Sequence, residues 1–192
     1  MIKAIQTRYT GRLFRSRLEA RWAVMLDCLK VSWEYEYEGF VLGDGTKYLP
    51  DFWMPELLCY VEIKPFTASA MEKSCCSQLA IGSGCRVYLF DSGIFCPGDQ
   101  HSSGLQAPGS MCFSPDGCPD VDYFWCQCIH CGEFGIEYQG RSDRLACKRR
   151  SINPCPKTPH GDRGVNYNSG PILVAYNAAM SARFEHGEQP NV

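Results

Sequence analysis

The sequence predicts an α/β fold in which helices pack on a mixed sheet, and three observations carry that prediction. Apolar residues recur at helical spacing over residues 16–30. Residues 48–64 alternate in the way expected of two strands joined by a turn. A helix-forming stretch at 67–81 separates the second of these strands from another apolar run at 86–90. Strand, helix and strand in this order predict a right-handed βαβ crossover within a compact α/β core.

Composition limits the class of protein. The 192 residues are 45 % hydrophobic, which suits one domain with a small appendage. The formal net charge of −2 provides no global basic field, so any surface for nucleic acid must be local. No stretch has the length of a signal peptide's apolar run or of a membrane span, and we therefore expect a cytoplasmic protein with no membrane partner. In a reducing compartment, the 13 cysteines are not expected to form a disulfide framework.

The helix expected over residues 16–30 begins at a capping pattern. Ser16 suits the N-cap, and Glu19 three residues later completes a capping box. Glu19 has a second interpretation, because it flanks the buried stripe and could point across the helix–sheet boundary toward the acidic residues described below. The two interpretations are compatible. The buried stripe consists of Leu18, Trp22, Met25, Leu26 and Leu29.

The first 15 residues carry basic side chains among polar ones. They predict either a basic arm or a solvated, partly disordered terminus. As a DNA-binding arm, this end of the chain would use Arg12, Arg15 and Arg17. The stretch 31–37 then alternates aromatic and polar residues, which predicts a half-exposed strand.

The hairpin predicted over residues 48–64 places two carboxylates opposite each other. A turn near Pro55 brings Asp51 across from Glu62, and opposed residues share a face at about 5 Å between Cβ atoms. Such carboxylates repel each other unless a cation lies between them, and oxygen ligands suit Mg²⁺. Lys64, on the same face, could contact a phosphate or an attacking water. These residues form a minimal site for metal-assisted phosphodiester hydrolysis; the alternative is a salt-bridged hairpin surface.

A second candidate metal site follows a change in composition. Residues 93–122 are rich in Gly, Pro, Ser and Asp without periodicity, which predicts a linker or insertion. Cys128 and Cys131, followed by glycine, have the C-x-x-C-G form of a zinc knuckle. With Cys147 and Cys155 they could supply four thiolates to Zn²⁺; the alternative is a set of unbound thiols.

The C-terminal part adds a basic patch and a helix. Lys148, Arg149 and Arg150 lie beside the cysteines and could contact DNA. Residues 171–186 predict a helix that docks on the body of the protein. Its apolar stripe consists of Leu173, Tyr176, Met180 and Phe184.

Glu19, Asp51, Glu62 and Lys64, in this order, resemble the PD-(D/E)-x-K nuclease superfamily. The match includes Pro50 before Asp51 and the run Glu62-Ile63-Lys64. Within the superfamily, the stretches FRSRLE, WEYE and YLPDF…VEIK look like the phage endonuclease I-type junction resolvases, and the nuclease subunit of Tn7-like transposases has a similar order.

The resemblance implies a restriction-endonuclease-like core, Mg²⁺ or Mn²⁺ as cofactor, and hydrolysis that leaves a 5′-phosphate. Carried over by position, Asp51 and Glu62 would bind the metal with the backbone carbonyl of Ile63. Lys64 would orient or activate water, and Glu19 would bind a second metal or position water.

These features together predict a nuclease core over 1–92, a linker over 93–122, a zinc-ribbon-like module over 123–160 and a tail with a C-terminal helix over 161–192. Gln78 falls near a glutamine that some superfamily members carry. The expected function is a metal-dependent DNA endonuclease for branched or structured DNA in phage or mobile-element DNA processing, and a homodimer is compatible with it. The alternative is a non-catalytic zinc-ribbon protein that binds nucleic acid or acts as an adaptor on a nuclease-like fold.

Overall fold

The centre of the molecule is a mixed sheet of six strands in the order β10-β9-β8-β7-β6-β3. The computed structural model describes residues 4–94, 110–129, 131–138 and 165–184. In this sheet β7 and β8 are parallel, and each other neighbouring pair is antiparallel. The strands are β3 (Glu34–Tyr35), β6 (Phe52–Met54), β7 (Cys59–Ile63), β8 (Arg86–Phe90), β9 (Ser110–Phe113) and β10 (Pro119–Val121).

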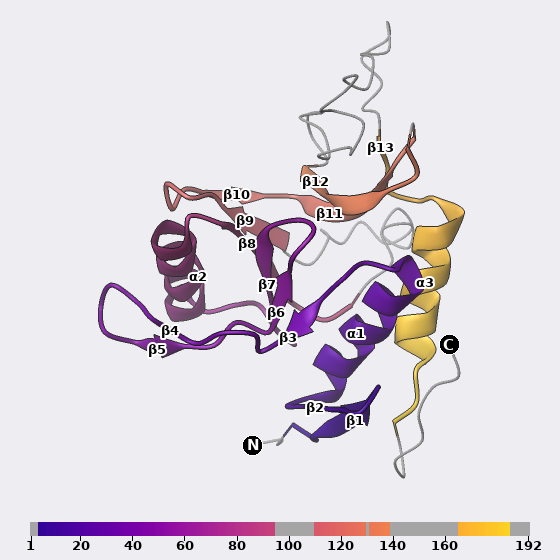
Figure 1. The fold of residues 1–192 in the computed structure, drawn as a ribbon, viewed down its shortest axis with the longest axis horizontal. Helices are drawn as coiled ribbons and strands as arrows, with labels where there is room; N and C mark the ends of the chain where they lie inside the picture. Colours follow the sequence, from indigo (N-terminus) through magenta and orange to yellow (C-terminus); the bar gives the residue numbers. More distant parts are fainter. Residues whose placement is uncertain (1–3, 95–109, 130, 139–164, 185–192) are drawn as a thin grey trace, which may run out of the picture.

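Helices cover both faces of this sheet (Figure 1). On one face lies α2 (Ala70–Ser83), whose Leu79 packs in one core with Leu89 of β8. On the other face lies α1 (Arg17–Leu29), and α3 (Gly170–Ser181) packs against α1. The predicted α/β class, with helices on a mixed sheet, is confirmed. The predicted strand–helix–strand unit is present as β7, α2 and β8.

Two small hairpins lie beside this sheet. One pairs β1 (Thr7–Tyr9) with β2 (Arg12–Phe14), and the other pairs β4 (Phe40–Val41) with β5 (Lys47–Tyr48). In Figure 1 the first hairpin lies near the start of α1, and the second extends from β3 and β6 toward the side of α2.

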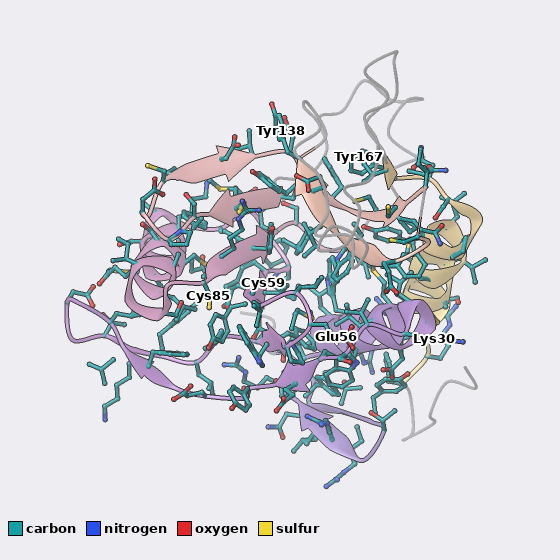
Figure 2. The ribbon with its side chains drawn as sticks, turned by 45° about the horizontal axis from the view of Figure 1, so that its top comes forward. Lys30, Glu56, Cys59, Cys85, Tyr138 and Tyr167 are labelled. Carbon is teal, nitrogen blue, oxygen red and sulfur yellow. The ribbon has the colours of Figure 1, made fainter. Side chains whose placement is uncertain are left out.

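A second sheet has three strands in the order β12-β11-β13. Its strands are β11 (Tyr123–Cys128), β12 (Phe134–Tyr138) and β13 (Val165–Asn166), and both pairings are antiparallel. The Tyr167 phenol donates a hydrogen bond to the Tyr138 carbonyl at 2.7 Å, which ties the chain after β13 to the end of β12 (Figure 2).

The N-terminal segment is a hairpin, so the expectation of a partly disordered terminus is wrong for residues 7–14, whereas the basic arm that binds DNA stays a prediction. Thr10 and Gly11, at the turn, both have positive φ, of 46° and 78°, as a tight two-residue hairpin turn requires. Tyr9 and Phe14 are buried in the main core, and Tyr9 meets the ring of Phe184 edge-on. Two buried aromatic residues anchor the segment, and an expectation drawn from its basic residues overlooks them.

The expected linker over 93–122 is wrong for two segments, because β9 and β10 extend the main sheet beyond β8. Cys112 of β9 is buried in the core that contains α1, and Phe113 is buried in the core that contains α2. A strand of four residues is too short to produce a clear periodicity among the surrounding turn-forming residues. The strand expected over residues 31–37 is longer than the observed one, because within it only Glu34–Tyr35 pairs with β6.

The C-terminal helix is present but ends at Ser181, before the expected residue 186. Its buried face also differs, because Leu173 and Met180 are only half-buried. The buried residues are Ile172, Ala175, Tyr176 and Ala179. Small alanines let α3 approach α1 closely, and a stripe counted on large apolar residues overlooks them. No helix in the described part of the chain has the length and apolar character needed to cross a membrane.

Candidate functional site

The β6–β7 hairpin brings Asp51 and Glu62 face to face. Its register pairs Phe52 with Val61, so the next pair along the hairpin is Asp51 with Glu62. The Ile63 N–H donates to Asp51 Oδ2 at 2.7 Å, and the Asp51 N–H donates to Glu62 Oε2 at 3.3 Å. The predicted opposition of the two carboxylates is therefore confirmed. In each carboxylate, one oxygen accepts a hydrogen bond from a backbone N–H, and the other oxygen is directed away from the hairpin backbone.

A cationic side chain reaches the second oxygen of each carboxylate. Arg15 Nη2 lies 2.7 Å from Asp51 Oδ1, and Lys64 Nζ lies 2.5 Å from Glu62 Oε1. Both acids are only 2 % exposed, whereas the Arg15 side chain is 50 % exposed. The salt bridges expected of an ordinary hairpin surface are thus present, but the carboxylates that make them are buried.

Acids outnumber cations around this pair. Arg15 Nε also lies 2.6 Å from Glu36, and Lys64 Nζ also lies 3.8 Å from Glu72 in the first turn of α2. Two inner and two outer carboxylates therefore share two cations. Further positive charge would stabilise this arrangement.

The protonation behaviour of Asp51 follows from this imbalance. Burial, and after it the negative charges of Glu62 and Glu19, raise the pKa of Asp51 well above its usual range. Burial acts to lower the pKa of Lys64, but the charges of Glu62 and Asp51 outweigh burial and raise that pKa overall. At neutral pH, Lys64 is an ammonium, and Asp51 is costly to ionise without an additional cation.

Glu19 makes the contacts of a helix cap. Its N–H donates to Ser16 Oγ at 3.2 Å, and Ser16 Oγ donates to Glu19 Oε1 at 2.7 Å. Tyr35 Oη donates to Glu19 Oε2 at 2.5 Å, and the Arg15 N–H donates to the same oxygen at 3.2 Å. The predicted N-cap at Ser16 is confirmed, but the capping box differs from the prediction, because the Glu19 carboxylate accepts from the Arg15 N–H, one residue before the N-cap. Glu19 also influences the acidic pair through its charge, which is one of the causes that raise the pKa of Asp51.

Three other predicted residues have different surroundings. The Arg12 guanidinium lies over the Trp33 ring at 5.0 Å from its centroid, and the buried Arg17 Nε has no hydrogen-bond partner among the described residues. The Gln78 side chain pairs with Asp44 in the β4–β5 loop, through bonds of 3.0 and 3.1 Å. Gln78 therefore stabilises the β4–β5 loop, and these contacts give no support to its match with a superfamily glutamine.

Three residues of the site were not predicted from the sequence. Tyr35 binds Glu19, Glu36 binds Arg15, and Tyr48 lies close to Glu62. Burial, followed by the charge of Glu62, raises the pKa of the Tyr48 phenol. Strand alternation could have indicated Tyr35, but not Glu36, because Glu36 has a left-handed φ of 48° that ends the alternation.

The knuckle cysteines lie at the turn between β11 and β12. The Gly132 N–H donates to the Cys128 carbonyl at 2.9 Å, and Gly132 has a φ of 76°, which favours glycine. Cys131 packs against a small buried cluster formed by Cys126 and Cys128. The turn therefore brings the first two predicted zinc ligands together.

The remaining parts of the predicted zinc module, Cys147, Cys155 and the basic run 148–150, lie outside the described residues. The four-cysteine set stays a prediction. Within the described residues, no group of three or more His, Cys, Asp or Glu side chains is arranged to hold a metal ion.

At the hairpin, the oxygens that fit a metal ion are Asp51 Oδ1 and Glu62 Oε1, which bond Arg15 and Lys64 in the structure. Two carboxylates suit Mg²⁺, which usually takes one or two of them and completes its coordination with water and phosphate oxygens. The chemistry of the donors and the excess of negative charge both agree with a divalent cation.

Comparison of the chain with protein-family models, with curated proteins and with solved structures finds no match.

Proposed function

We propose that this chain is a metal-dependent DNA endonuclease that hydrolyses phosphodiester bonds with Mg²⁺ or Mn²⁺. The observation that carries the proposal is the buried pair of Asp51 and Glu62, in which each carboxylate directs one oxygen to a cation. Facing buried acids cost stability unless positive charge compensates them. A buried acid whose pKa is raised by burial and by a second acid, as that of Asp51 is, marks a candidate functional site.

The roles proposed for the residues are those that the resemblance implies, and the contacts of Asp51, Glu62 and Lys64 are compatible with them. Asp51, Glu62 and the Ile63 carbonyl would hold the metal, which when bound polarises phosphoryl oxygens and increases the acidity of water. Lys64, an ammonium beside Glu62, would orient the attacking water and stabilise the negative charge that develops on the phosphate.

Arg15 occupies the oxygen of Asp51 that a metal ion would need. Because Arg15 also pairs with Glu36 and is half exposed, it can leave Asp51 and keep a partner. Its guanidinium would then offer N–H donors to a phosphate oxygen beside the site. Glu19, through its bond to the Arg15 N–H, would position this segment.

A zinc module is the second part of the proposal, with Cys128, Cys131, Cys147 and Cys155 as ligands. The turn at Gly132 supports it, because that turn packs Cys131 against the cluster that contains Cys128. The basic run 148–150 would contact DNA phosphates. The same turn also supports the alternative function, a non-catalytic zinc-ribbon protein that binds nucleic acid or acts as an adaptor.

Incubation of supercoiled plasmid with purified protein tests the proposal. We expect nicked and linear DNA with Mg²⁺ or Mn²⁺ and intact plasmid with EDTA. Binding of DNA without cutting in either metal would favour the alternative function.

A further inference from the structure

Among the described residues, Tyr37 and Phe66 are the two aromatic side chains that are largely exposed, at 55 % and 80 %. Both lie close in sequence to residues that contact the acidic pair directly or through Arg15. Tyr37 comes directly after Glu36, which binds Arg15, and Phe66 comes two residues after Lys64. Single exposed apolar residues are ordinary on protein surfaces, but these two lie beside Glu36, which binds Arg15, and beside Lys64, which binds Glu62.

The Tyr37 ring is held in a fixed plane. It stacks on Trp53 of β6, with ring centroids 6.4 Å apart and an angle of 23° between the planes. Trp53 in turn packs against Tyr60 of β7, at 4.6 Å between centroids. Tyr37 is therefore the outermost ring of an aromatic stack that begins on the hairpin carrying Asp51.

The loop that carries Phe66 is anchored on both sides of it. The Lys64 N–H donates to the Phe90 carbonyl at 2.9 Å, and the Ala68 N–H donates to the buried Asp91 carboxylate at 2.8 Å. Phe66 itself stays exposed between these two anchors. A fixed backbone with an exposed ring loses little conformational freedom on binding, which favours a contact surface.

We propose that Tyr37 and Phe66 stack on unpaired nucleobases of a DNA strand whose backbone passes over Asp51 and Glu62. This inference rests on the proposed function and adds the residues that grip the substrate. Every nucleobase has a π-face, so aromatic stacking binds single strands with little dependence on sequence. The protein's own acids at the site outnumber its cations, so these side chains alone attract phosphates weakly, and stacking supplies affinity that their charge does not.

The test measures binding of a labelled single-stranded oligothymidylate by fluorescence anisotropy in Ca²⁺, with a second oligonucleotide of equal length whose central nucleotides are abasic. Tyr37→Ala and Phe66→Ala should each weaken binding of the first oligonucleotide about tenfold. Tyr37→Trp and Phe66→Trp should retain it, because tryptophan also stacks. Val41→Ala, at a residue 73 % exposed on β4, is the matched control and should bind as the parent does.

The abasic oligonucleotide separates stacking from phosphate binding. It should bind the parent weakly and should not distinguish the parent from the alanine variants. Equal binding of both oligonucleotides by the parent, or equal binding of the first oligonucleotide by the parent and both alanine variants, would overturn the inference. No binding of the single strand at all would overturn it too, and would leave the exposed rings as a contact for a protein partner.

The result is independent of the plasmid assay. If the parent cuts plasmid but the alanine variants bind the oligonucleotide normally, the stacking inference fails and the proposed hydrolysis stands. If the parent cuts no plasmid but binding depends on both rings and on the bases, the hydrolysis fails and the stacking inference stands.

Discussion

Replacing Asp51 with asparagine should stabilise the protein at neutral pH when no metal is present. Asp51 is buried opposite Glu62, and its pKa is raised by burial first and by the charges of Glu62 and Glu19 next. In the unfolded chain the pKa of an aspartate is about 3.9, below the raised pKa that Asp51 has in the folded state. Asp51 therefore makes its full contribution to the free energy of unfolding only below about pH 3.9. That stability is lost as the pH rises through the folded pKa. Asparagine has no charge to bury and therefore avoids this loss.

The size of the gain follows from the contacts of Asp51. The variant loses the ion pair with Arg15, which is worth about 0–1 kcal/mol because Arg15 is half exposed and keeps Glu36. The asparagine carbonyl can still accept the hydrogen bond from the Ile63 N–H. Removing a charge buried against a second carboxylate should therefore give a net gain at pH 7, of about 1 kcal/mol, the size usual for a single substitution.

Urea unfolding in EDTA at pH 7 and at pH 4 measures this difference. The gain of Asp51→Asn over the parent should be present at pH 7 and close to zero at pH 4. Asp116→Asn, which changes an exposed acid in the β9–β10 turn, should not show this pH-dependent gain. An Asp51→Asn variant that is less stable than the parent at pH 7 would mean that the ion pair with Arg15 outweighs the cost of burial, and it would refute the reasoning.

Three further predictions concern other parts of the chain. Glu19→Gln should keep its helix content and cut plasmid within about twofold of the parent, because the glutamine carbonyl can still accept the hydrogen bond from the Arg15 N–H. A tenfold loss with intact circular dichroism would give Glu19 the catalytic role that the resemblance implies. Elemental analysis should find one Zn²⁺ per chain in protein purified without chelator, and absence of zinc would contradict the zinc site. Neutralising residues 148–150 should flatten the salt dependence of DNA binding, and an unchanged salt slope would contradict the role of these residues in binding DNA. Gly117→Ala should destabilise the protein by about 1–2 kcal/mol, because a Cβ there would meet Ile81 Cδ1 at 2.7 Å on a backbone with a φ of +80°. In its control, Gly82→Ala in α2, the new Cβ meets no atom within 4 Å, and the variant should be more stable than the parent by about 0.5–1 kcal/mol. A lower free energy of unfolding in both variants would reject the packing argument.

Local patterns predicted the parts of the fold that position the acidic pair. Alternation over 48–64 predicted the hairpin and the opposition of Asp51 and Glu62, and capping residues predicted the start of α1 at Ser16. These features depend on residues close in sequence, whose periodicity is a direct result of strand and helix geometry. Strand β9 and the burial of the N-terminal hairpin depend on distant partners, and no local pattern reports them.

The environment of the site was harder to predict for the same reason. Arg15 was expected to contact DNA, but it binds Asp51, which is 36 residues away in the chain. Tyr48 and Tyr35 reach the acids from separate strands, and only the folded chain brings them there. The sequence therefore predicted which acids face each other, whereas the side chains that tune them depend on tertiary packing.

Plasmid cleavage by paired variants tests the central claim most directly. Asp51→Asn and Glu62→Gln each remove one negative oxygen donor and should each lower the cleavage rate at least ~100-fold in matched Mg²⁺ or Mn²⁺. Asp116→Asn should cut at the rate of the parent. Circular dichroism on the same samples should show that both variants remain folded. Undiminished cutting by both Asp51→Asn and Glu62→Gln would contradict the assignment of the hairpin acids to catalysis.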